Sequence, residues 1–191
     1  WFVKGGQSYK PMSYRTDGDW SQAAFFMAAG AVSGDVTVQG VDINSTQGDK
    51  EIAELLKRFG ADVEIKSNSV RVKKSKLKSI KIDARQIPDL VPVLSVLAAR
   101  AEGTTEIYGA ERLRIKESDR LKSSAALINS LGGKAEEKAD GLVIHGSGEL
   151  KGGKADGFND HRIVMSASVA ALFCKDNVTV TDKESINKSF P

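Results

Sequence analysis

Two short polar blocks hold the residues best suited to chemistry. The first, Asn159 to Arg162, stands directly before an apolar segment that predicts a helix. Asn and Asp are common helix caps, but a cation at the start of a helix opposes the helix dipole. His161 and Arg162 are tolerable there when an anion lies between them and the helix end. The block therefore indicates an anion-binding site in addition to a cap.

The second block, Arg112 to Leu121, precedes a predicted amphipathic helix. Its alternation places Arg112, Arg114 and Lys116 on one side of an extended segment. One interpretation is a solvated face whose charges are balanced by acidic neighbours. Clustered cations at the start of a helix fit better with a pocket for phosphate or carboxylate oxygens.

A third cluster, Ile87 to Asp89, opens another apolar segment. Pro88 suits the first helical turn, and Asp89 lies where the backbone N–H groups lack partners. Taken alone, the cluster favours a plain helix-start charge. Gly18 to Trp20 and Asn159 to Arg162 hold equivalent positions at two other helix starts. We therefore expect three polar clusters to meet at one end of the domain.

An internal repeat positions these clusters. The segment Leu55 to Glu64 resembles Leu127 to Glu136, and each predicts the end of an amphipathic helix, a glycine cap and two short strands. Gly34 to Gly40 likewise resembles Gly103 to Gly109. Apolar segments that predict fully buried helices complete the pattern: Ala23 to Val32, Leu90 to Ala101 and Ile163 to Phe173.

One unit therefore contains a strand, a buried helix, a strand, an amphipathic helix and two more strands, over about 70 residues. The chain is predicted to hold two full copies and a partial third. We expect an α/β (α+β) fold in which βαβαββ repeats pack with pseudo-threefold symmetry, helices inside and sheets outside. Residues 1–14 are predicted to cross over from a missing neighbouring domain, and residues 15–191 are predicted to form the domain itself.

The composition excludes several classes of protein. The 191 residues are 40% hydrophobic and 28% charged with a net charge of +3, which argues against disorder and does not favour nucleic acid. No apolar run approaches the roughly 18 residues of a membrane helix. Cys174 is the single cysteine and His145 has no partners at metal-ligand spacing, so no metal is expected. Without a signal peptide, the expected location is the cytoplasm.

Together these motifs resemble the 5-enolpyruvylshikimate-3-phosphate synthase family. The resemblance runs in order over essentially the whole chain, and its Lys-Glu-Ser-Asp-Arg-Leu and Asn-Asp-His-Arg blocks are highly specific. It corresponds to roughly the C-terminal half of these enzymes, whose two domains each contain three βαβαββ units. The motifs that carry it are Gly18 to Phe26, Ile87 to Asp89, Arg114 to Leu121, Asn159 to Arg162 and Lys188 to Pro191.

The resemblance implies transfer of the enolpyruvyl group of phosphoenolpyruvate to the 5-hydroxyl of shikimate 3-phosphate, with release of phosphate. In the family this is an addition followed by an elimination, with no metal or organic cofactor. It also implies that Asp89 contacts the shikimate ring and accepts a proton, and that Glu117 takes part in proton transfer. Lys116 and Arg112 correspond to contacts of shikimate 3-phosphate, although one branch of the family has Asn in place of Arg112.

A second group corresponds to the family's phosphoenolpyruvate clamp: Arg120, Arg162 and Lys188. His161 corresponds to a nearby supporting residue. We expect the clamp residues to serve binding and not the fold. Changing each to Met should then alter stability by no more than about 0.5 kcal/mol.

Much of the family's shikimate phosphate site lies on a partner domain that this chain does not contain. We therefore expect the chain to be inactive alone, to need the missing N-terminal domain, and to be monomeric when complete. No nucleic acid or membrane partner is expected. Two alternatives stay open: UDP-N-acetylglucosamine enolpyruvyl transferase, which shares the architecture, and a stand-alone anion-binding module.

Overall fold

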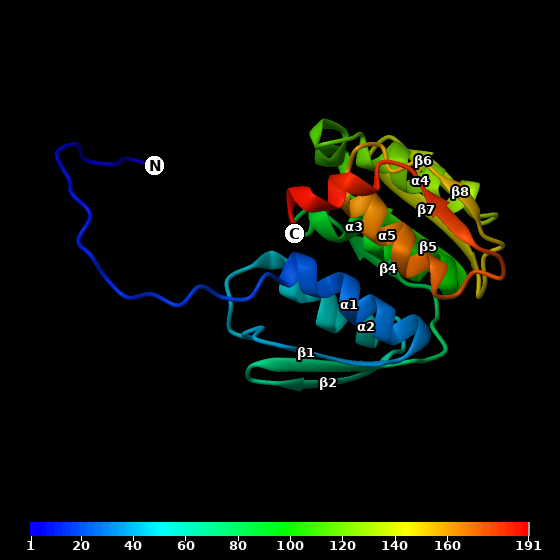
Figure 1. Cartoon of the computed structure of the whole chain (residues 1–191), viewed down its shortest axis with the longest axis horizontal. Coiled ribbons are helices and arrows are strands. Elements are labelled where there is room, and N and C mark those ends of the chain that lie inside the picture. Colours follow the sequence, from blue (N-terminus) through cyan, green and yellow to red (C-terminus); the bar gives the residue numbers. More distant parts are fainter. Residues whose placement is uncertain (191) are drawn as a thin grey trace.

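Three apolar helices form the centre of the structure, a computed structural model that describes residues 1–190. They are α1 (Trp20–Ser33), α3 (Val91–Arg100) and α5 (His161–Ala171), and each packs against the other two. Because they are apolar on nearly every face, they can be covered on all sides with few buried polar groups left unpaired. Their prediction as buried helices is confirmed (Figure 1).

An antiparallel sheet lies against α1. It has the order β1-β3-β2, formed by β1 (Asp35–Gln39), β2 (Asp62–Lys66) and β3 (Ser69–Lys73). Its register sets Val36 opposite Val72. Side chains on a strand alternate between the two faces, so the valines of these strands decide which face meets the helix.

The second and third sheets contain parallel pairs. The second has the order β4-β5-β7-β6, and the third pairs β8 with β9. Parallel strands need a crossover, and here α3 links β4 to β5 while α5 links β8 to β9. The predicted α/β arrangement is confirmed. The bounds are β4 (Lys81–Asp83), β5 (Glu102–Tyr108), β6 (Lys134–Lys138), β7 (Gly141–Ser147), β8 (Gly153–Ala155) and β9 (Val178–Val180).

The amphipathic helices lie outside the central three. They are α2 (Ile52–Arg58), which follows a 3-10 turn η1 (Gly48–Glu51), and α4 (Arg120–Ser130). Glycine follows the last turn of each, with φ of 92° at Gly60 and 84° at Gly132, a conformation that glycine adopts without a Cβ clash. A hairpin comes next in both units, β2–β3 and β6–β7. The predicted repeat is confirmed for this part of the unit.

The first unit differs from the predicted complete copy. Residues 1–19 contain no strand, so within residues 1–190 only the second unit has all six elements. This segment is exposed nearly throughout and runs away from the sheets in Figure 1, so it has no strand edge to pair with. The third unit contains β8, α5, β9 and a 3-10 turn η4 (Lys183–Lys188).

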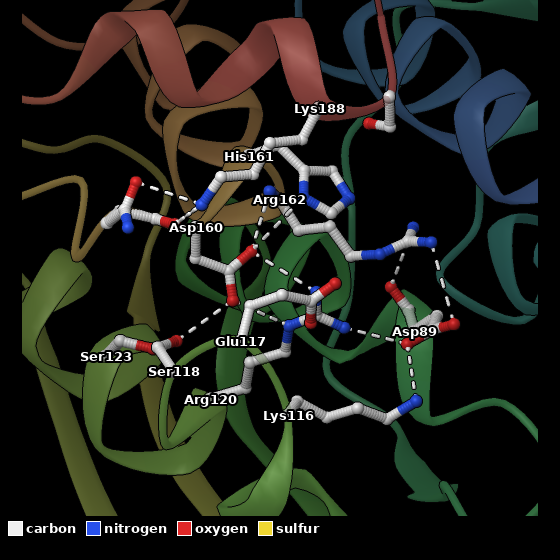
Figure 2. Close-up of polar contacts among 12 residues, drawn as sticks. Asp89, Lys116, Glu117, Ser118, Arg120, Ser123, Asp160, His161, Arg162 and Lys188 are labelled. Carbon is white, nitrogen blue, oxygen red and sulfur yellow. Dashed lines mark hydrogen bonds and ion pairs between the residues drawn. The ribbon is translucent and has the colours of Figure 1, made fainter.

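Several helix starts converge at one end of the domain. A 3-10 turn η2 (Pro88–Leu90) leads into α3, and another, η3 (Glu111–Ile115), precedes α4. The turn before α5 holds Phe158 and Asn159 with φ of 51°, a left-handed conformation that residues other than glycine rarely adopt. This turn sets the start of α5 beside the starts of α3 and α4, where Asp89 and Arg120 lie (Figure 2).

The described residues contain neither a membrane-spanning helix nor a cluster of metal-ligand side chains. Among residues 1–190, no helix combines the length and apolar character that crossing a membrane requires. The same residues contain no group of three or more His, Cys, Asp or Glu side chains placed to hold a metal ion.

Candidate active site

Arg120 lies at the centre of the polar network at this end of the domain (Figure 2). It is the first residue of α4, and its side chain is only 1% exposed. Its Nε donates to Asp160 Oδ2 at 2.8 Å and its Nη1 donates to Asp89 Oδ1 at 2.7 Å. Its Nη2 donates to Glu117 Oε2 at 2.6 Å and to Asp160 Oδ1 at 3.2 Å. Four of the five guanidinium N–H groups are therefore paired with carboxylates.

Asp160 is the most deeply buried carboxylate of the network. It caps α5 by accepting from the Arg162 backbone N–H at 3.0 Å, and the Ser118 hydroxyl donates to its Oδ2 at 2.9 Å. Burial acts to raise its pKa, but the hydrogen bonds and charge of Arg120 and the bond from Arg162 outweigh burial, so the pKa lies below its ordinary value. Asp160 is therefore ionised at neutral pH.

Asp89 faces three cations from different elements. Besides Arg120, it lies 3.3 Å from Lys116 Nζ, and its Oδ2 lies 3.6 Å from Arg162 Nη2. Burial again acts to raise the pKa, but Arg162, Lys116 and Arg120 together hold it below the usual value. The carboxylate is therefore charged. Solvent still reaches it among its three cations, since the Asp89 side chain is 30% exposed.

Arg162 has spare donors. Its contacts with Asp89 are long, at 3.5 Å to the carbonyl and 3.6 Å to the carboxylate, and its buried Nε has no partner among the described residues. Buried guanidinium groups normally form several short hydrogen bonds, and Arg162 forms none with its side chain among the described residues. It can therefore bind an added anion without breaking a short hydrogen bond of the fold.

His161 is mostly buried beside this guanidinium. Its Nδ1 has no hydrogen-bond partner in the described chain and lies 3.8 Å from Asp160 Oδ1. Burial, and then the positive charge of Arg162, lower its pKa below the ordinary value. The ring is therefore neutral at pH 7 and adds no positive charge to the site.

Lys188 brings the end of η4 to the start of α5. Its Nζ donates to the Asn159 carbonyl oxygen at 2.5 Å and to Asn159 Oδ1 at 2.9 Å. The side chain thus lies beside the block Asn159 to Arg162 although the two are far apart in sequence (Figure 2). Pro191, which ends the Lys188 motif, lies outside the described residues.

The prediction of an extended segment before α4 is wrong. Residues Glu111–Ile115 form the 3-10 turn η3, so the alternation of Arg112, Arg114 and Lys116 does not place them on one side. Arg114 turns to the sheet, where it donates to the carbonyl oxygens of residues 138 and 139 and pairs with Glu137. Its donors serve the fold.

Arg112 lies apart from the central network. It lines an open pocket of about 340 Å³ that also includes Asp89 and Asp49. Sequence reasoning did not identify Asp49, which is buried in η1 and accepts a hydrogen bond from the Ser21 hydroxyl. Burial raises its pKa despite that hydrogen bond. Its neighbours Gly48 and Lys50 are typical of an exposed turn, so no local signal could have revealed it.

One expectation does not hold for Arg120. It was expected to serve binding and not the fold, yet it is as buried as the apolar core and contacts three carboxylates. A buried charge with buried partners belongs to the fold as well. The expected small effect of Arg120→Met on stability is therefore replaced by a large one.

The assembled site favours anions. The four cations drawn in Figure 2, Lys116, Arg120, Arg162 and Lys188, outnumber the three carboxylates Asp89, Glu117 and Asp160. Helix starts add the partial positive charge of unpaired backbone N–H groups. Carboxylates beside an anion site can also exchange protons with a bound molecule.

The chain is similar to known proteins over its whole length. A family model described as EPSP synthase (3-phosphoshikimate 1-carboxyvinyltransferase) matches residues 1–191. The chain is 50% identical over 190 residues to the 3-phosphoshikimate 1-carboxyvinyltransferase of Clostridium acetobutylicum, covering 100% of the chain and 44% of that relative. The identity to the enzyme of the same name from Methanococcus vannielii is 44% over 191 residues, covering 99% of the chain and 44% of the relative.

A solved structure shows the same fold. EPSP synthase from Acinetobacter baumannii matches with a TM-score of 0.80 and 34% identity, over 90% of this chain and 43% of that one. The chain thus spans less than half the length of the relatives that it matches.

Proposed function

Because this chain belongs to the EPSP synthase family, we propose that it forms one wall of a site for enolpyruvyl transfer. The group moves from phosphoenolpyruvate to the 5-hydroxyl of shikimate 3-phosphate, and phosphate is released. The observation that carries the proposal is the convergence of Lys116, Arg120 and Arg162 on Asp89 at the helix starts. Arg120 also pairs with Glu117, and Lys188 lies beside them against Asn159. Both substrates are anions that such a site can bind.

The reaction needs two proton transfers in its first step. Glu117, a 42% exposed carboxylate paired with Arg120, first takes up a proton from solvent. The 5-hydroxyl oxygen then attacks C2 of phosphoenolpyruvate while its proton passes to Asp89, and C3 receives the proton held on Glu117. In the second step C3 returns a proton to Glu117 as the C2–O bond to phosphate breaks. The proton held on Asp89 leaves with the phosphate. Two carboxyl groups with separate proton roles are enough for both steps, and the mechanism calls for no metal or organic cofactor.

The cations divide between the two substrates. Lys116 and Arg112 bind shikimate 3-phosphate, since Lys116 adjoins Asp89 and Arg112 lines the neighbouring pocket. Arg120, Arg162 and Lys188 bind phosphoenolpyruvate. Neutral His161 supports the guanidinium of Arg162 by filling the space beside it.

The second wall of the site would come from the remaining part that the relatives carry. Domain closure over anionic substrates needs groups from both walls, so the chain alone should not turn over. We propose that the complete protein is a monomer. We also propose that it works in the cytoplasm, a reducing compartment in which a single cysteine stays a free thiol.

The test uses the full-length protein, meaning this chain joined to the part that completes its relatives. Phosphate release from phosphoenolpyruvate and shikimate 3-phosphate should be saturable in both substrates. The isolated chain should match a blank without enzyme. Turnover with UDP-N-acetylglucosamine in place of shikimate 3-phosphate, or none with either acceptor, would contradict the proposal.

Arg162→Lys should weaken phosphoenolpyruvate binding by about tenfold or more, although the net charge is unchanged. Arg binds a carboxylate or phosphate with two parallel hydrogen bonds, whereas Lys is a point charge. KM for phosphoenolpyruvate measures the change. The dissociation constant of shikimate 3-phosphate, measured alone, should stay close to wild type.

Arg71→Lys is the matched control, because Arg71 forms a bidentate pair with Asp35 on the outer sheet, away from the site. It should leave both constants unchanged. Equal weakening of both substrates by Arg162→Lys, or of neither, would remove Arg162 from the clamp.

A further inference from the structure

The carboxylate partners of Arg120 are of two kinds. Asp160 is 0% exposed and binds the Nε–Nη2 edge of the guanidinium with two hydrogen bonds. Glu117 and Asp89 bind the terminal edge, formed by Nη2 and Nη1, and are 42% and 30% exposed. One edge of Arg120 is therefore held from inside the domain, and the other faces the site.

Both two-donor edges of the Arg120 guanidinium are occupied, and its one unpaired N–H, on Nη1, offers a single bond. An anion that binds Arg120 with two parallel hydrogen bonds must therefore replace a partner. Displacing Asp160 would leave a buried carboxylate without a cation, which is strongly unfavourable. Displacing a half-exposed carboxylate returns it to water, and exposed pairs contribute little. The replaced partner is thus on the terminal edge.

Glu117 is the easier of the two terminal partners to replace. Asp89 also contacts Lys116 and Arg162, so it keeps two cations when Arg120 turns to another anion. Among the described residues Arg120 is the only cation within ion-pair distance of Glu117. A single hydrogen bond to Arg120 therefore holds the Glu117 carboxylate in this position.

We propose that Glu117 holds the place on Arg120 that a substrate carboxylate or phosphate takes, and that Asp160 is the positioning residue that holds the guanidinium for the exchange. This rests on the proposed function for the identity of the anion. Binding then frees the Glu117 carboxyl beside the bound substrate, so the proton-transfer group is released only when there is a substrate to act on.

Two substitutions test the exchange by the sign of their effects. Glu117→Gln and Asp160→Asn each remove one negative charge bonded to the same guanidinium. Simple electrostatics predicts that both tighten anion binding. The exchange predicts opposite results: Glu117→Gln removes a competitor and tightens binding about 3- to 10-fold, whereas Asp160→Asn loosens the guanidinium and weakens binding about tenfold or more.

Asn caps a helix about as well as Asp, so Asp160→Asn keeps the start of α5 intact. Asp119→Asn is the matched control, because Asp119 caps α4 in the same way but pairs with Arg114. It should leave anion affinity unchanged. If Asp160→Asn fails to fold, Ser118→Ala takes its place: it removes one hydrogen bond to Asp160 and should weaken binding by about two- to threefold.

The measurements are equilibrium titrations of the full-length protein with phosphoenolpyruvate, without shikimate 3-phosphate so that no turnover occurs, and separately with inorganic phosphate. Effects of the same sign for Glu117→Gln and Asp160→Asn (or Ser118→Ala), or no tightening by Glu117→Gln, would overturn the exchange. Opposite signs in the phosphate titrations of a protein that does not turn over would retain the exchange and reject the proposed function.

Discussion

Asp89→Ala in the full-length protein is expected to lower kcat by about 10²–10⁴-fold and to change KM much less. The carboxylate is charged, half-exposed and adjacent to the cations assigned to both substrates. Removing it takes away the acceptor for the hydroxyl proton while the anion contacts stay. Steady-state phosphate release at saturating concentrations of both substrates measures kcat.

Asp19→Ala is the control for a helix-start carboxylate. Asp19 caps α1, whereas Asp89 is the second residue of the turn before α3. Among the described residues, the Asp19 side chain accepts only from the backbone N–H groups of Ser21 and Gln22. The change should lower stability by about 1 kcal/mol and leave kcat nearly intact. If Asp89→Ala behaves in the same way, Asp89 is a helix-start charge and not the proton acceptor.

Arg120→Met should lower the free energy of unfolding by about 3–5 kcal/mol. The reason is Asp160, which is 0% exposed and would keep its charge without the guanidinium that compensates it. Glu117 and Asp89 would be less affected, because solvent reaches both. Urea unfolding at neutral pH, with the midpoint and slope fitted together, measures the loss.

A double substitution separates this ion pair from lost packing. Asp160→Asn in the Arg120→Met background removes the stranded charge and should recover part of the stability. Arg71→Met, which breaks an exposed pair with Asp35, should leave the unfolding midpoint close to wild type. An Arg120→Met protein as stable as Arg71→Met would show that the buried pair adds nothing to the fold.

These outcomes bear on how the site recognises its substrates. Arg120 pairs four of its five N–H groups with carboxylates. Among the described residues, the Arg162 side chain makes only long contacts and keeps an unpaired Nε. The two guanidinium groups therefore differ in what they offer an incoming anion. Arg162 can bind the anion directly, and Arg120 can bind it with two hydrogen bonds only by exchange.

The sequence alone determined the repeat and its helices. The match of Leu55 to Glu64 with Leu127 to Glu136 predicted the glycine that ends each amphipathic helix and the hairpin after it, and both are present. Such features depend on residues only a few positions apart, whose spacing selects helix or strand directly. Because the repeat aligns the helix starts, it also predicted that the polar clusters meet at one end.

The tertiary structure decided which charges pair. Arg120 and Asp160 are 40 residues apart in sequence, and nothing local distinguishes Arg120, which is buried, from Arg114, which binds the edge of the sheet. Alternation of Arg112, Arg114 and Lys116 suggested a strand, but the chain forms a 3-10 turn there. The free energy of an ion pair depends on the water excluded around it and on partners from distant segments. Neither quantity exists until the helices have packed.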